Sequence, residues 1–145
     1  MDFSYVAAIS ASGMDVERAR LDAAAINLAN AHTTRTAEGR PYKPLRVVST
    51  FSSTEPFSGT FSTGIHTMPG ARLVDIRGAD VAPRLAYEPG HPDADPRGFV
   101  AYPGVDPTLE MVNLMTAVRS YEANVIAMNA AKVMTLKALE IGGSS

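Results

Sequence analysis

The sequence contains no cysteine and no tryptophan among its 145 residues. Without cysteine, the chain has no disulfide framework, no thiolate ligand for a metal ion and no cysteine nucleophile. The absence of tryptophan also disfavours a carbohydrate or aromatic-ligand site. These two absences remove several classes of enzyme and of small disulfide-stapled domain from consideration.

Clustered positive charge and long apolar runs are lacking as well. The 13 Lys and Arg residues are scattered and the net charge is −2, so nothing predicts binding to nucleic acid or to an anionic membrane. No apolar run approaches the roughly 20 residues of a membrane-spanning helix, which predicts no direct membrane insertion. The N-terminal region lacks a basic start and carries charges from Asp15 to Asp22, unlike a secretory signal. We therefore expect a cytoplasmic chain, or one exported without a cleaved leader.

Proline and glycine divide the chain into three zones of one structural unit. Nine of the ten prolines and most glycines lie within residues 32–105. Residues 1–31 lack proline and are rich in alanine, and residues 106–145 contain one proline, at their start. Since proline and glycine interrupt regular elements, we predict a helix in 1–31, a β-rich central segment in 32–105 and a second helix in 106–145.

The N-terminal zone has the residue spacing of a helix. Apolar or small residues recur there at three- and four-residue steps or their multiples, namely Phe3, Val6, Ser10, Met14, Leu21, Ala25 and Leu28. Glu17 and Arg20 are placed to pair one turn apart. Two starts are open: one near Asp2, and one at Gly13 after a segment that resembles a capping box. The pattern ends at Asn30.

Short β-like runs separated by turn residues fill the central zone. Leu45–Phe51 is apolar and β-branched, and Ala71–Arg77 alternates between two faces. Val81–Tyr87 contains a proline, which predicts an edge strand or a bent segment. Phe99–Tyr102 is too short to stand alone. Ser49–Thr67 is rich in Ser, Thr, Phe and Gly, and we interpret it as a flexible loop or hairpin.

The C-terminal zone predicts a helix of about 35 residues, roughly three times the mean length in globular proteins. Asp106 is a favourable N-cap, Pro107 suits the first helical position, and Gly142 ends the pattern. Apolar residues form a broad stripe at heptad-like steps, namely Leu114, Val118, Tyr121, Val125, Met128 and Leu139, widened by Met111, Met115 and Leu136.

The two helices present more apolar surface than the central zone can cover. We predict an α+β fold in which the long terminal helices pair as a coiled-coil-like hairpin around a small β-rich insert. The apolar surface left over predicts contacts with other copies or other proteins. The residues expected at that interface are Val6, Met14, Leu21, Leu28, Leu114, Val118, Tyr121, Val125, Met128 and Leu139.

Candidate chemistry is confined to one short segment. His91, Asp93 and Asp95 alternate in a stretch rich in proline and glycine. A calcium loop is excluded because prolines occupy the intervening positions and no Glu follows at the required offset. A rigid turn is the better interpretation, and a small hydrolase or metal-binding enzyme is the alternative. No nucleophile elbow or phosphate loop occurs, so we predict no catalytic residue, no metal and no cofactor.

Several segments are similar to one known family. The N-terminal stretch Ile9–Asp22, continued through Ala25–Asn30 to Thr34, resembles the signature of flagellar rod and hook axial proteins. Further segments resemble the proximal-rod members of that family, namely Pro83–Asp95, Gly98–Pro103, Glu110–Met115, Ser120–Asn124 and Leu136–Gly142. The likeness covers nearly the whole chain apart from about residues 49–68. Departures at Met14, Glu17 and Leu21 keep residue size or helix propensity.

The resemblance implies a structural subunit of the flagellar basal body and no enzyme. It implies export through the flagellar type III apparatus with an uncleaved N-terminus, and polymerisation in the periplasm into a tubular rod. The implied partners are copies of the chain itself, other proximal-rod proteins and the export apparatus. An adaptor or chaperone that uses the same helices transiently is the remaining alternative, and it predicts a soluble complex of defined stoichiometry.

Overall fold

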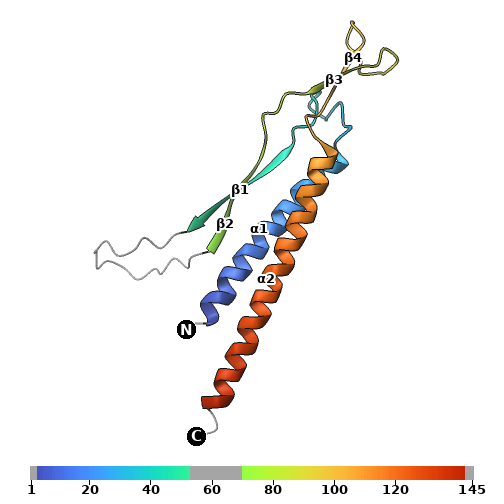
Figure 1. The fold of residues 1–145 in the computed structure, drawn as a ribbon. Helices are drawn as coiled ribbons and strands as arrows, with labels where there is room; N and C mark the ends of the chain where they lie inside the picture. The colour runs from blue at the N-terminus through green and yellow to red at the C-terminus, as the bar shows by residue number, and fades with distance from the viewer. Residues whose placement is uncertain (1–2, 53–69, 143–145) are drawn as a thin grey trace, which may run out of the picture.

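Two long helices lie side by side and antiparallel, with two small β-hairpins between them in the chain (Figure 1). The computed structural model describes residues 3–52 and 70–142. Helix α1 spans Phe3–Ala29 and helix α2 spans Pro107–Gly142. This arrangement confirms the predicted α+β class, with paired terminal helices and a small antiparallel β insert.

Helix α1 takes the earlier of the two predicted starts. It runs without interruption from Phe3, so the alternative start at Gly13 is wrong. The Ser12 hydroxyl donates to the Ile9 carbonyl one turn back (2.8 Å) instead of capping a new helix. Glu17 and Arg20 form the predicted i,i+3 ion pair at 2.7 Å.

Helix α2 begins as its sequence predicts. The Asp106 carboxylate accepts hydrogen bonds from the Thr108 amide at 2.9 Å and the Leu109 amide at 3.3 Å, as an N-cap does. Pro107 occupies the first helical position, where no amide hydrogen is needed. The last turns of α2 project beyond the start of α1, so part of α2 has no α1 beside it (Figure 1).

The contact between the two helices is made largely by small residues. Gly13 of α1 lies against Asn124 of α2 so closely that a Cβ atom at Gly13 would sit 3.0 Å from the Asn124 Nδ2. Glycine and alanine let helix backbones approach closely, because no long side chain separates them. We call this contact the seam. The buried residues of the two helices are Ser10, Val16, Ala19, Ala23, Ala24, Asn27, Glu110, Ala117 and Ala131.

One β-hairpin lies along α1. Strands β1 (Leu45–Ser52) and β2 (Gly70–Gly78) pair antiparallel, with Leu45 opposite Gly78 and a register shift after Val48. Both strands contact α1. The predicted run Leu45–Phe51 is confirmed as a strand. Its end overlaps the segment 49–67 that was predicted to be a loop or hairpin. Residues 49–52 are strand paired with β2, which is compatible with the hairpin alternative, and positions 53–67 fall outside the described residues.

A second β-hairpin stands beyond the end of the helix pair (Figure 1). Strands β3 (Arg84–Tyr87) and β4 (Phe99–Tyr102) pair antiparallel, with Arg84 opposite Tyr102. The strand starts directly after Pro83, because proline has no amide hydrogen to contribute to the ladder. In the described ranges, neither helix is long and apolar enough to cross a membrane.

Candidate assembly surface

The interface residues predicted on α1 border the seam and do not lie in its centre. Met14, Leu21 and Leu28 are half-buried, and Val6 is 41% exposed. They carry large apolar side chains beside a contact that alanine dominates. Each therefore keeps apolar area that the folded chain leaves uncovered.

The residues predicted on α2 show the same division. Leu114, Val125 and Met128 are half-buried, while Val118 and Tyr121 lie at the margin of exposure. Leu139, near the C-terminal end of α2, is 67% exposed. The structure thus brings none of these side chains into a closed core.

Further exposed apolar side chains were not singled out by the stripe. Ile126 is 69% exposed and Ile141 is 76% exposed. A heptad-like stripe selects one side of a helix, whereas the apolar residues of α2 occur on several sides. A count of all large apolar residues in the C-terminal zone would have identified Ile126 and Ile141. The exposed residues outside the predicted stripes also include Ile9, Ile26, Leu109, Val112, Val133 and Met134. Met111, Met115 and Leu136, which widen the predicted stripe of α2, are exposed as well.

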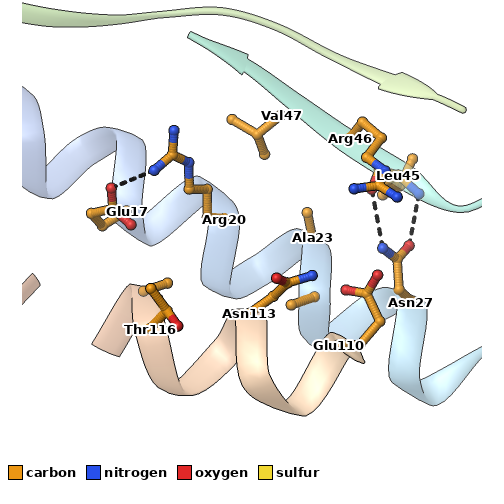
Figure 2. A pocket seen from close by; sticks show the side chains of 12 residues that line it. Glu17, Arg20, Ala23, Asn27, Leu45, Arg46, Val47, Glu110, Asn113 and Thr116 are labelled. Carbon is orange, nitrogen blue, oxygen red and sulfur yellow. Dashed lines mark hydrogen bonds and ion pairs between the residues drawn. The ribbon is translucent and has the colours of Figure 1, made fainter. Parts of the chain in front are cut away.

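A pocket opens where α1, α2 and β1 meet (Figure 2). Its volume is about 260 Å³. Glu17 and Arg20 of α1 line one side, Glu110 and Asn113 of α2 line another, and Val47 of β1 closes the third. Sequence periodicity does not reveal this pocket, because it combines residues from three elements far apart in the chain.

Asn27 joins α1 to the start of β1 at one end of this pocket. Its Nδ2 donates to the Leu45 carbonyl at 3.0 Å, and its Oδ1 accepts from the Leu45 amide at 2.7 Å and the Tyr42 hydroxyl at 2.8 Å. Asn27 is almost completely buried. Burial raises the pKa of the Tyr42 phenol, and the nearby Glu110 carboxylate raises it further. The cluster therefore fixes the hairpin β1–β2 against α1.

Four polar residues of α2 lie in different surroundings. Asn124 is in the seam, where its Nδ2 donates to the Ser120 carbonyl at 3.0 Å. Asn113 lines the pocket, and Arg119 and Asn129 are exposed. Asn124 lies against Gly13 of the opposite helix, where an added side chain would require displacement.

The segment with His91, Asp93 and Asp95 is a set of turns held by its own carboxylates. Asp93 accepts from the Thr34 hydroxyl at 2.8 Å and pairs with Arg35 at 3.3 Å, which ties this segment to the chain after α1. In residues 3–52 and 70–142, no three His, Cys, Asp or Glu side chains gather as a metal site. The carboxylates are thus engaged in structure.

Asp95 closes the turn that leads into β4. Its Oδ1 accepts from the Phe99 amide at 2.9 Å and the Arg97 amide at 2.8 Å. The hydrogen bond from Phe99 is the main cause that lowers the pKa of the Asp95 carboxyl below its usual value. The ionised carboxylate is therefore part of the turn.

Comparison with known proteins gives consistent likenesses over nearly the whole chain. Residues 97–141 match the family described as flagellar basal body rod FlgEFG protein C-terminal. The flagellar basal-body rod protein FlgC of Bacillus subtilis (strain 168) is 42% identical over 142 residues, which cover 92% of this chain and 94% of that protein. FlgC of Salmonella typhimurium (strain LT2) is 38% identical, with 92% and 93% covered. FlgC of Aquifex aeolicus (strain VF5) is 37% identical, with 91% of each chain covered.

Proposed function

Because the chain belongs to the FlgC family of flagellar basal-body rod proteins, we propose that it is exported by the flagellar type III system and polymerises through its terminal helices into the drive-shaft tube of the proximal rod. Its role as a structural component of the basal-body rod follows from the family itself. The proposed partners are copies of the chain, other proximal-rod proteins and the export apparatus. The proposed location of the assembled form is the periplasmic rod.

The observation that carries this proposal is the uncovered apolar surface on both helices. Leu136, Leu139 and Ile141, in the last turns of α2, are more than half exposed. Burial of apolar area stabilises association by about 25 cal/mol per Å² before the costs of ordering. Such side chains are expected to be covered by neighbouring subunits, since they lie on long helices and not in a ligand cavity.

Export with an uncleaved N-terminus is supported by the position of α1. The helix begins at Phe3, and its seam residues from Ser10 onward hold α2. Cleavage within α1 would remove residues that are buried in the folded chain. Mass spectrometry of the chain from purified basal bodies checks this, and a start beyond α1 would contradict it.

Deletion of the gene tests the rod function directly. Electron microscopy of basal bodies from the deletion strain should show rings without a rod, and re-expression should restore the rod. Intact rods and normal filaments in the deletion strain would contradict the proposal. A soluble complex of fixed stoichiometry would instead indicate an adaptor.

A point substitution tests the helix surface specifically. Val118→Asp should prevent rod assembly, because it places a charge where an apolar contact with a neighbour is expected. Lys132→Asp introduces the same side chain at an exposed position of α2 that is already polar, and it should assemble normally. Basal-body yield from the two strains provides the measurement. Equal yields would show that the surface around Val118 is not an interface.

A further inference from the structure

The outer face of the hairpin β1–β2 carries a row of charged side chains. Ser49 of β1 turns towards α1, where its hydroxyl oxygen accepts a hydrogen bond from Arg20 at 3.3 Å. Side chains alternate between the two faces of a strand, so Arg46, Val48 and Thr50 lie on the face of β1 that points away from α1. Residues directly opposite one another in a ladder share a face, and the partners of these three are Arg77, Asp75 and Arg72.

The register shift after Val48 places both arginines of β2 on this outer face. The pairing passes from Asp75 to Leu73 and skips position 74. In a regular strand Arg72 and Arg77, five positions apart, would point to opposite faces. Arg72, Asp75 and Arg77 are exposed, and no ion pair within the described residues includes any of them. We call these three side chains the arginine row.

A face of α1 that neither α2 nor the hairpin covers carries a second row of charges. Asp15, Arg18 and Asp22 recur at steps of three and four residues, which places them on one side of the helix. All three are exposed, whereas Val16 and Ala19 between them are buried. In the described part of the chain, no ion pair includes any of these three residues. We call them the aspartate row.

The two rows are complementary in the order of their charges and similar in length. The arginine row is positive, negative and positive along the hairpin, and the aspartate row is negative, positive and negative along α1. The arginine row spans four residues of the opposite strand, about 14 Å. The aspartate row spans seven residues of helix, about 10 Å, and the long arginine side chain covers the difference. Arg46, opposite Arg77, adds positive charge to the hairpin face, although it also lines the pocket.

We propose that the arginine row of one copy of this chain docks on the aspartate row of a second copy in the rod. The inference rests on the proposed function, because it requires polymerised copies. Within one chain the rows do not meet, since the hairpin lies on α1 by its other face. Each copy therefore offers one row to one neighbour and the other row to the next, which is a heterologous contact that repeats along an assembly.

The rows set the position of the neighbour more than the strength of its binding. Single exposed ion pairs contribute little free energy, and the exposed apolar side chains of the helices supply the larger attraction. Alternating charges instead define one register, because a shift by one step brings like charges together. The contact between rows therefore fixes how far one copy is displaced along the helix of the next.

Charge reversal of one row should reduce incorporation into the rod, and reversal of both rows should restore it. Arg72→Glu with Arg77→Glu, or Asp15→Lys with Asp22→Lys, should lower the amount of the chain in purified basal bodies about tenfold, because like charges then face each other. The chain with all four substitutions should incorporate like the parent. Parent-like incorporation of either double variant, or failure of the fourfold variant to recover, would overturn the inference.

Two controls separate this effect from folding and from net charge. All four positions are exposed and outside the ion pairs of the described residues, so thermal unfolding of each free variant should occur at the parent's Tm. Arg119→Glu with Lys132→Glu changes the net charge equally at exposed positions of α2, and it should incorporate normally. A loss of incorporation in this control equal to that of the arginine-row variant would overturn the inference.

Crosslinking tests whether the two rows meet between copies, and the absence of natural cysteine makes it specific. Copies with Asp75→Cys and copies with Arg18→Cys, made in one strain, should give a bismaleimide-linked peptide pair that joins positions 75 and 18 in purified basal bodies. Asp75→Cys with Glu122→Cys, exposed on α2, is the control and should give none.

The outcomes of this experiment distinguish the inference from the proposed function. Rods that contain both kinds of copy but no linked pair, or that link position 75 to a different rod protein, would overturn the inference and leave the rod function intact. Rods that never contain the chain would instead overturn the proposed function.

Discussion

The side-chain amide of Asn27 pairs with both backbone groups of Leu45. Nδ2 donates to the Leu45 carbonyl at 3.0 Å and Oδ1 accepts from the Leu45 amide at 2.7 Å. Asn27 thus takes the place that a neighbouring strand would occupy at the start of β1. A helix residue thereby fixes where the hairpin β1–β2 begins.

Replacing this amide should destabilise the whole chain. Asn27→Ala leaves the Leu45 backbone groups and the Tyr42 hydroxyl without their buried partner. We expect the free energy of unfolding to fall by about 2–4 kcal/mol. Urea unfolding measures the change. Asn129→Ala, at an exposed position of α2, is the control and should change it by less than about 0.5 kcal/mol.

The seam should tolerate only small side chains at Gly13. A Cβ atom there would lie 3.0 Å from Nδ2 and 3.1 Å from Oδ1 of Asn124. Gly13→Ala gains about 1 kcal/mol of helix propensity but loses stability through this contact. In the Asn124→Ala background the contact is absent, so Gly13→Ala should be stabilising there. A double-mutant cycle by urea unfolding measures the coupling, and additive effects would contradict close contact.

Gly98 should resist substitution for reasons of backbone conformation. Its φ is 85°, a region that costs about 1–2 kcal/mol for residues with a Cβ atom. An added Cβ would also lie 2.9 Å from the Tyr87 ring. Because Gly98 accepts a hydrogen bond from the Glu88 amide, Gly98→Ala should speed hydrogen exchange of that amide about tenfold, which corresponds to ~1.4 kcal/mol.

Two glycines separate the causes of this effect. Gly39 also has a positive φ, 75°, but has open space around the position of a Cβ atom. Gly90 has open space and no positive φ. Gly39→Ala should therefore cause backbone strain without a steric clash. Gly90→Ala should cause neither backbone strain nor a steric clash. Loss of protection in Gly90→Ala equal to that in Gly98→Ala would contradict this explanation.

The turn before β4 should weaken in acid. The hydrogen bond from the Phe99 amide lowers the pKa of Asp95 in the folded chain. A lowered folded pKa means that the stabilisation is complete above the ordinary aspartate value of about 3.9 and is lost as the pH falls through the folded pKa. NMR titration of the Asp95 carboxyl should give a midpoint below that of the acid-unfolded chain. A midpoint above it would show that the amides do not hold the ionised form.

Local chemistry explains why some elements could be predicted and others could not. The start of α2 follows from Asp106 and Pro107 alone, since capping depends on adjacent residues. The choice between two starts of α1 could not be made locally, because Ser12 and Gly13 are as compatible with a cap as with the middle of a helix. Packing of Gly13 against Asn124 settles it in the fold.

The seam and the pocket lay beyond the sequence patterns for a different reason. Periodicity weighs hydrophobicity, so it selected large residues such as Leu21, whereas the seam depends on small size at Ala19 and Ala23. Glu110 reads as a helix-start carboxylate that favours the positive end of α2. Glu110 also lines the pocket between α1 and β1, and this position could not be predicted because it depends on the tertiary arrangement.

The seam joins the two ends of the sequence, and this has a consequence for the order in which the molecule folds. Residues of α1 can contact α2 only after the segment between them, which includes both hairpins, has been synthesised. The loop that this contact closes is therefore long, and its conformational entropy must be lost before the contact forms. During synthesis from the N-terminus, α1 can contact β1 and β2 early, but it lacks α2 until the final quarter of the chain emerges. The nascent chain therefore spends most of its elongation time with the side of its first helix that faces α2 uncovered.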